Sequence, residues 1–179
     1  MTRERPQVQP PARNALAKAQ RSAVHLELRD SYMLDDPEFI AWQQGKRLDP
    51  ADRSSWWGGW HDAVRDAVAR GVVVRRARII SEPISDYARY EYDGTFTNIA
   101  AGELVRWLPR RRATDLALPG TDFWVFDGAQ ALFHHFTGDG QLDVDGREYT
   151  DDPERVKPCA DAFEAVWRRA IPHEEYRPR

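Results

Sequence analysis

The segment VVVRRARIISEPISDYARYEYDGTFTNIAAGELVRWLP, residues 72–109, decides the fold class. It begins with VVVRRARII, a continuous β-branched run after a glycine, which is typical of a strand. The run SEPISDYARYEY has the serine and proline pattern of a helix start, and ELVRWLP predicts a second strand that ends at Pro109. A strand, a helix and a strand in succession indicate an α/β protein.

The preceding segments extend this pattern. HLELRD (25–30) alternates like a short strand, and DPEFIAWQQG (36–45) predicts a helix that ends at a glycine. A second helix ends at Gly71. It begins either near residues 49–52 or only after the glycines at 58–59, which interrupt its apolar spacing.

The following segments complete the fold. DFWVFDG (122–128) and ALFHHFTGDG (131–140) predict two antiparallel strands joined at Asp127-Gly128, a strong hairpin signal. A last helix opens at residues 151–153 and runs to about Arg169. The predicted order is therefore β-α-α-β-α-β-β-β-α, a single mixed-sheet domain with flanking helices.

Length and proline content set the expected boundaries. A chain of 179 residues suits one hydrophobic core, and we expect residues 25–179 to form a single α/β domain. Residues 1–24 contain three prolines and little to bury, which predicts a flexible basic tail with some helix after Pro11. A basic arm that reaches a partner or DNA is the alternative interpretation of this tail.

Charge is distributed unevenly. The tail has five basic residues against Glu4, about +4, which leaves about −7 for the rest because the whole chain carries −3. An acidic body makes nucleic acid an improbable direct partner, since phosphate neutralisation needs a basic face. No apolar run approaches the ~20 residues of a membrane span, and a single cysteine suits a reducing compartment. We therefore expect a cytoplasmic protein without membrane contact.

Several motifs in combination resemble a known family. The runs SEPISDYARYEY, VRWLPRR, LPGTDFWVFDG and AIPHEEY, together with Asn98 and AGE, are similar to DUF6879, an actinobacterial family of unknown function. The resemblance covers roughly residues 25–176. Because we associate the family with genes for helix-turn-helix regulators, it implies a regulatory role and such a regulator as a partner.

A looser likeness concerns the fold. AGELVRWLP followed by GTDFWVFDGAQALF is similar to one half of a phospholipase D domain, in which a strand carries His-x-Lys and an Asp five residues later. Aligning that Asp with Asp127 places Gly120 at the histidine and Asp122 at the lysine. Neither can act as the imidazole nucleophile or the phosphate-binding cation, so the likeness implies a degenerate, non-catalytic version.

The strongest candidate site combines a strand and a helix. Arg76 and Arg78 share one side of the strand at 72–80, and Tyr87 and Glu91 stand at i and i+4 on the following helix. With Arg89, these side chains could bind a small anionic or amide-bearing ligand. The alternative is an ion-pair network that ties the helix to the strand.

Further candidates follow along the chain. Asn98, expected in a loop, lies near Glu103 and Arg106, which flank a strand in the sheet centre. Arg110, Arg111 and Arg112 form the densest basic patch of the body, where contact with nucleic acid competes with a solvated loop.

Metal sites find little support in the sequence. His134 and His135 are adjacent on a strand and point to opposite faces, and GDGQLDVDG does not match the spacing of a calcium loop. We interpret GDGQLDVDG as two hairpin turns and expect neither a metal nor a cofactor. Since Trp56 and Trp57 cannot both face inward on one helix, one of them is expected to line a pocket or a partner surface.

We thus expect a non-catalytic regulatory or sensor domain. Its ligand- or partner-binding residues would be Arg78, Tyr87, Arg89, Glu91, Asn98, Glu103, Arg106 and Asp127. The alternative is an enzyme for a small metabolite or phosphate ester, with Glu91 or Asp127 as acid/base and an arginine as anion clamp.

Overall fold

Seven strands form one mixed sheet in the computed structural model, which describes residues 11–179. In sheet order the strands are β6 (Leu142–Thr150), β5 (Gln130–Phe136), β4 (Asp122–Phe126), β1 (Ser22–Glu27), β2 (Val73–Ile80), β3 (Leu104–Pro109) and β7 (Ile171–Pro172). The β1–β2 and β2–β3 pairs are parallel, and all other neighbours are antiparallel.

Helices connect the parallel strands, as such crossovers require. The helices are α1 (Pro11–Lys18), α2 (Pro37–Gln43), α3 (Gly59–Ala69), α4 (Asp86–Ala100) and α5 (Pro153–Arg169), and short 3-10 turns occupy Arg53–Ser55 and Arg110–Arg112. Side chains of Asp36, Ser85 and Asp152 accept N–H groups at the starts of α2, α4 and α5. The predicted order of elements is confirmed, with α1, β6 and β7 added.

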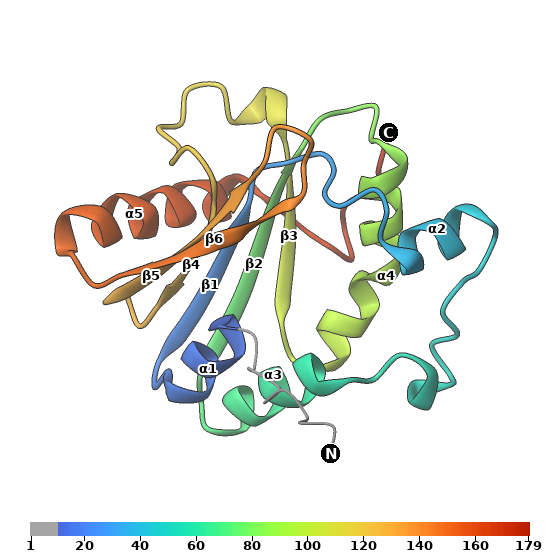
Figure 1. Cartoon of the computed structure of the whole chain (residues 1–179), viewed down its shortest axis with the longest axis horizontal. Coiled ribbons are helices and arrows are strands. Elements are labelled where there is room, and N and C mark those ends of the chain that lie inside the picture. Colours follow the sequence, from blue (N-terminus) through green and yellow to red (C-terminus); the bar gives the residue numbers. More distant parts are fainter. Residues whose placement is uncertain (1–10) are drawn as a thin grey trace, which may run out of the picture.

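The two faces of the sheet are covered differently (Figure 1). Helix α5 packs on one face, where apolar side chains such as Leu26, Ile79, Phe123 and Phe163 form the largest core cluster. The other face is covered by α1 and α3 at one end, and α4 lies beyond β3 with α2 outside it. This second face holds the buried charged side chains.

The helix expected after Pro11 is present as α1, but the expectation that residues 11–24 form a tail outside the domain is wrong. Helix α1 packs against α3, with Leu16 fully buried and Ala15 and Ala19 beside it, and β1 already begins at Ser22. The sequence did not predict this packing because the buried apolar side chains of this segment are too few to give a clear periodic signal. The part of the predicted tail before Pro11 lies outside the described residues.

The two hairpin turns expected in GDGQLDVDG are only half correct. A turn at Thr137–Gln141 joins β5 to β6, but Asp145 and Gly146 lie within strand β6. The strand is held by its ladder with β5, which contains an irregularity between His134 and Phe136. Gly146 permits the close approach there, since a Cβ would lie 2.4 Å from the His135 carbonyl oxygen.

No helix among the described residues is long and apolar enough to cross a membrane.

Candidate functional site

Alternation of side chains along β1 and β2 places a group of charged and polar side chains on the face of the sheet opposite α5. This group, His25, Glu27, Arg76 and Arg78 with their partners, is here called the ladder. His25 and Glu27 project from β1 on this face because Leu26 projects into the α5 core. Arg76 and Arg78 project from β2 in the same way, with Ala77 on the other side. The parallel register pairs His25 with Arg76 and Glu27 with Arg78, so the charges become neighbours.

Glu27 lies at the centre of this ladder. It accepts hydrogen bonds from Nη1 of Arg76 and Nε of Arg78 and is 6% exposed. Burial alone would raise the pKa of Glu27, but the guanidinium groups of Arg78 and Arg76 hold it well below its usual range. Glu27 is therefore ionised, and both arginines are hydrogen-bonded to it.

The ladder continues from both arginines toward α4 and β3. Arg76 Nε also donates to Glu103 Oε1 at 2.8 Å, and Glu103 Oε2 accepts from Asn98 Nδ2 at 2.7 Å. Arg78 Nη1 donates to Thr95 Oγ1 at 2.9 Å, and Arg78 Nη2 lies 3.5 Å from Glu91 Oε1. Each arginine thus bridges two carboxylates.

Two further carboxyl groups, those of the largely buried Glu91 and the buried Asp122, have fewer cationic partners. Burial raises the pKa of Glu91 to about 7, against the opposing effect of Arg78 and with a smaller contribution from the Glu27 charge. Burial also raises the pKa of Asp122 to about 6. Asp122 accepts from the Leu28 N–H at 2.9 Å and from the Tyr32 hydroxyl. Both groups hold protons more tightly than free carboxylates do.

Two histidines lie beside these carboxyl groups with unused nitrogen atoms. The His25 ring stacks on Trp124 at 4.3 Å, and its centroid is 5.7 Å from that of His134. Nε2 of both His25 and His134 is buried without a hydrogen-bond partner, and His25 Nδ1 forms no hydrogen bond although it lies 3.4 Å from Glu27 Oε1. Burial, followed by the charge of Arg76, lowers the pKa of His25 well below its ordinary value, and burial lowers that of His134 to about 4. Both rings are neutral.

These groups line a pocket of about 260 Å³, here called the central pocket. Its lining residues are His25, Glu27, Tyr32, Met33, Tyr87, Glu91, Asp122, His134, Phe136, Leu142 and Arg147. The ring centroids of Tyr32 and Phe136 are 5.3 Å apart, and those of Tyr32 and Tyr87 are 5.8 Å apart. The pocket is therefore lined by ionisable side chains, among them Glu91 and Asp122, and by aromatic rings.

Five of the eight predicted binding residues belong to this arrangement. Tyr87 and Glu91 line the pocket from one side of α4, as their i, i+4 spacing predicted. Arg78, Glu103 and Asn98 belong to the ladder beneath it. Asn98 reaches Glu103 from the last turn of α4, however, and the expectation of a loop position is wrong.

The other three predicted residues lie elsewhere. Arg106 is on the α5 face, where Nη1 donates to the Trp167 carbonyl oxygen at 3.0 Å. Arg89 is half-buried on α4, and its charge acts on Tyr176 rather than on Glu91. Asp127 adopts a positive φ of 53° in the β4–β5 turn and accepts backbone N–H groups of residues 20–22. Asp127 therefore anchors the start of β1 and is not among the residues that line the pocket with Glu91.

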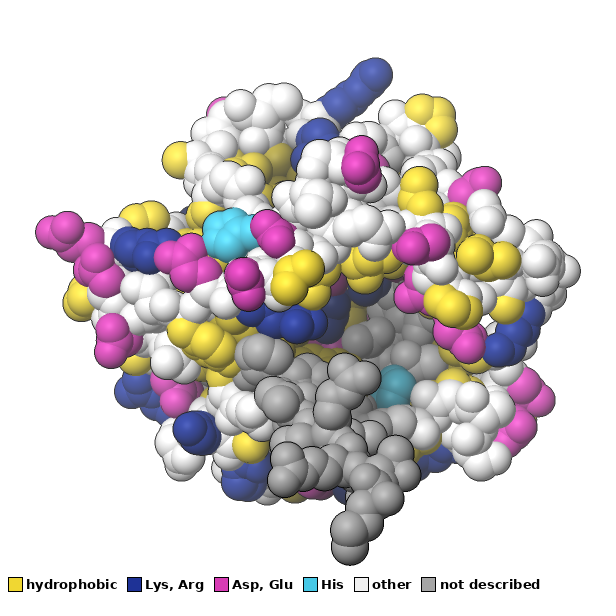
Figure 2. Space-filling view, viewed as in Figure 1, with side chains coloured by type: hydrophobic (Ala, Val, Ile, Leu, Met, Phe, Trp, Pro, Cys, Tyr) yellow, Lys and Arg dark blue, Asp and Glu magenta, His cyan; other side chains and the backbone are white. Residues whose placement is uncertain are grey.

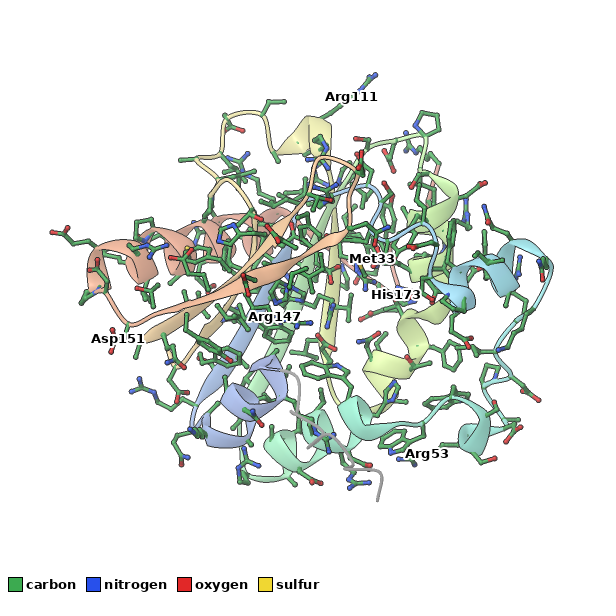
Figure 3. The ribbon with its side chains drawn as sticks, viewed as in Figure 1. Met33, Arg53, Arg111, Arg147, Asp151 and His173 are labelled. Carbon is green, nitrogen blue, oxygen red and sulfur yellow. The ribbon has the colours of Figure 1, made fainter. Side chains whose placement is uncertain are left out.

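The arginine patch is not a continuous surface. Arg110 donates to Ser81 Oγ and to the carbonyl oxygens of Leu28 and Ile79, so it is a structural residue. Arg111 projects away from the body (Figure 3), and Arg112 is exposed. On the face seen in Figure 2, basic and acidic side chains are mixed without a large patch of one sign.

A second hollow of about 320 Å³, here called the outer pocket, lies between α2, α4 and the start of α3. Trp42, Trp56 and Tyr90 line it, so Trp56 lines a pocket as expected, but Trp56 and Trp57 precede α3 and do not share a helix. Its charged groups are mutually paired: Lys46 lies 3.0 Å from Glu38, and Arg47 lies 3.7 Å from Asp93. The outer pocket therefore offers fewer unused polar atoms than the central pocket.

Only Tyr87 and Glu91 of the residues that line the central pocket were predicted as site residues. Glu27, Tyr32 and His25 had no predicted role, and His134 was considered only as a metal ligand. The alternation of HLELRD contained one usable signal, because Leu26 and Leu28 on one side place His25 and Glu27 together on the other. The positions of the remaining residues depend on strand register.

Comparison with solved structures shows the fold. Nuc, a phospholipase D family member from Salmonella typhimurium, is similar with 12% sequence identity and a TM-score of 0.50, over 93% of this chain and 88% of that chain. TrmBL2, an archaeal chromatin protein with a novel mode of DNA binding, is similar with 15% identity and a TM-score of 0.46, over 88% of this chain. This chain spans 47% of TrmBL2, about half its length. The likeness to Nuc confirms the expected fold relation to phospholipase D.

The comparison with curated proteins gave no match. The family described as "Domain of unknown function (DUF6879)" matches residues 11–178, nearly the whole chain, and this protein therefore belongs to the DUF6879 family.

Proposed function

We propose that this protein is a non-catalytic regulatory domain that binds a small ligand in the central pocket. The main support is the pair of neutral histidines whose buried Nε2 atoms have no hydrogen-bond partner. Buried polar atoms without hydrogen bonds are costly, and a ligand with complementary groups would remove that cost. A site of this kind stabilises the ligand-bound state relative to the empty one, which is what a sensor requires.

The charge of the central pocket argues against phosphodiester chemistry on this fold. Arg76 and Arg78 are both bound to Glu27, so neither is free to clamp a phosphate. An entering phosphate would meet the carboxyl groups of Glu91 and Asp122, and Arg147, the one arginine among the lining residues, is exposed. A binding function therefore fits these residues better than the chemistry that the fold relation suggests.

A helix-turn-helix regulator is the partner we propose, in the cytoplasm. The support for the partner is the association of this family with such regulators. The single cysteine, Cys159, is buried and free, which fits a reducing compartment. In this scheme the ligand changes the stability or shape of the domain, and the regulator responds to that change.

The test is native mass spectrometry of gently purified protein, followed by thermal unfolding against a metabolite panel. Two adjacent histidines supply a matched pair of variants. His134 lies in the pocket, whereas His135 is exposed on the other side of β5 and bonds Glu148. We expect His134→Gln to remove a ligand-dependent rise in Tm and His135→Gln to retain it. Equal responses in both variants would refute binding in the central pocket.

A further inference from the structure

We propose that the ligand of the central pocket is a small organic cation, such as a primary or quaternary ammonium compound. This inference rests on the proposed function, since it names the chemical class that the same pocket would bind. It derives from three features of the site: an excess of buried carboxyl groups, aromatic walls, and unpartnered imidazole nitrogens.

The first feature is a count of the buried network. Glu27, Glu103, Glu91 and Asp122 supply four carboxyl groups, and Arg76 and Arg78 supply two guanidinium groups, which leaves a formal charge of −2. Two further arginines lie near this network: the exposed Arg147 lines the pocket, and Arg29 lies over the Phe136 ring and acts on Asp122, so the charge of −2 is that of the buried network alone. Buried charge of one sign is strongly unfavourable unless a counter-charge or protons neutralise it.

When no cation is bound, protons on the carboxyl groups neutralise the excess negative charge of the network. Glu91 and Asp122, the two carboxyl groups with least cationic compensation, are the two whose pKa values are raised by burial. The charged groups that act on Glu91 are Arg78, Glu27, Arg76 and Asp122, so the network titrates as a unit. A bound cation would replace a proton and keep the network neutral.

The second feature is the wall of rings around the carboxyl groups. Tyr32, Tyr87 and Phe136 surround the cavity, and the negative faces of such rings attract cations. The guanidinium of Arg29 already lies 4.9 Å over the Phe136 ring, so that ring binds one cation within the protein itself. Among the described residues no three His, Cys, Asp or Glu side chains are placed to hold a metal ion, so the aromatic walls favour an organic cation over a bare metal ion.

The third feature is the set of free acceptors. A neutral imidazole has one nitrogen that accepts a hydrogen bond, so His25 and His134 offer one acceptor each beside Glu91. A primary ammonium group has only donors and therefore complements this set, whereas a quaternary ammonium group has no N–H and would be bound through its charge and the aromatic rings alone. The cavity volume of about 260 Å³ lies below the ~300–1,000 Å³ typical of drug-sized ligands, which limits the ligand to a small molecule.

A panel of probes matched in size but not in charge tests the inference. Isothermal titration at about pH 8 compares n-butylammonium, tetramethylammonium, butan-1-ol and butyrate at millimolar concentration. We expect both cations to bind about tenfold more tightly than the alcohol and the acid. Titration of n-butylammonium below about pH 7 should release protons, since the cation displaces them from the carboxyl groups.

Two variants on one helix locate the binding. Glu91 lines the central pocket, whereas Asp93 lies two residues later and lines the outer pocket. We expect Glu91→Gln to weaken n-butylammonium binding about tenfold and Asp93→Asn, with the same change in charge, to leave it unaltered. Far-ultraviolet circular dichroism verifies that both variants fold.

Three results would overturn the inference: preference for butan-1-ol or butyrate, no binding of either cation, or loss of cation binding in Asp93→Asn alone. The proposed function fails separately. A neutral or anionic metabolite that binds in a His134-dependent manner would refute the cation but retain the ligand-binding domain.

Discussion

Glu91→Gln should stabilise the protein at alkaline pH and leave its stability almost unchanged in mild acid. Glu91 is buried beside Arg78, but their closest approach is 3.5 Å and Arg78 also bonds Glu27 and Thr95. Glutamine resembles the protonated carboxyl group in shape and lacks its charge. The variant therefore removes the cost of a buried carboxylate without leaving Arg78 unpaired.

The pKa shift of Glu91 sets the magnitude. Its pKa is about 7 in the folded state against 4.5 for the ordinary side chain, so the folded state binds the proton more tightly. Stability from this group is complete below pH 4.5 and is lost as the pH rises through about 7. A shift of this size corresponds to about 3 kcal/mol in the free energy of unfolding. His134, whose pKa is lowered, titrates with the opposite sign, but it does so in both proteins.

Urea unfolding of the wild type, Glu91→Gln and Asp93→Asn at several pH values measures this effect. The difference between Glu91→Gln and the wild type should grow from near zero at about pH 4.5 to about 3 kcal/mol at about pH 8. Asp93→Asn should show no such growth, because Asp93 is exposed and bonds Trp42. A pH-independent difference, or destabilisation by Glu91→Gln at pH 8, would show that Glu91 is a fully compensated ion-pair partner.

Three further substitutions test the assigned structural roles of individual residues, each by thermal or urea unfolding. Glu27→Gln should destabilise the protein by ~3–5 kcal/mol, because it leaves two buried guanidinium groups without their shared carboxylate; a loss below about 1 kcal/mol would contradict the central role of Glu27. Asp127→Ala should cost about 2 kcal/mol through lost hydrogen bonds to residues 20–22, with ligand response retained, and a lost response would return Asp127 to the site. Leu16→Ala should cost ~2–5 kcal/mol, since Leu16 is fully buried, whereas a neutral result would restore the tail hypothesis.

Local sequence signals predicted the elements that carry strong periodicity. The β-branched run at 72–80 and the Asp127-Gly128 turn give the same answer in sequence and structure because they are fixed by neighbouring residues. Strand β6 was missed because its glycine and two aspartates are typical of turns, and only the pairing with β5 makes it a strand.

The site shows the same limit. Tyr87 with Glu91, and Arg76 with Arg78, could be grouped because helix and strand periods place them on common faces. That Glu27 would lie beside Arg78 depends on the parallel register of β1 with β2, which is a tertiary property. Asp127 was assigned to the site through a motif alignment, and the structure shows that its carboxylate is saturated by backbone N–H groups.

The two faces of the sheet have different roles, and this division explains which substitutions the protein should tolerate. Six ionisable side chains are buried on the face opposite α5: His25, Glu27, Arg76, Arg78, Glu103 and Asp122. Such a network adds little net stability, because desolvation offsets most of the attraction. Stability must therefore come mainly from apolar burial, to which the α5 face contributes the largest cluster. Replacing a charged side chain around the pocket by a neutral one should therefore affect ligand binding more than stability. Glu27 is the exception, because both Arg76 and Arg78 are hydrogen-bonded to its carboxylate.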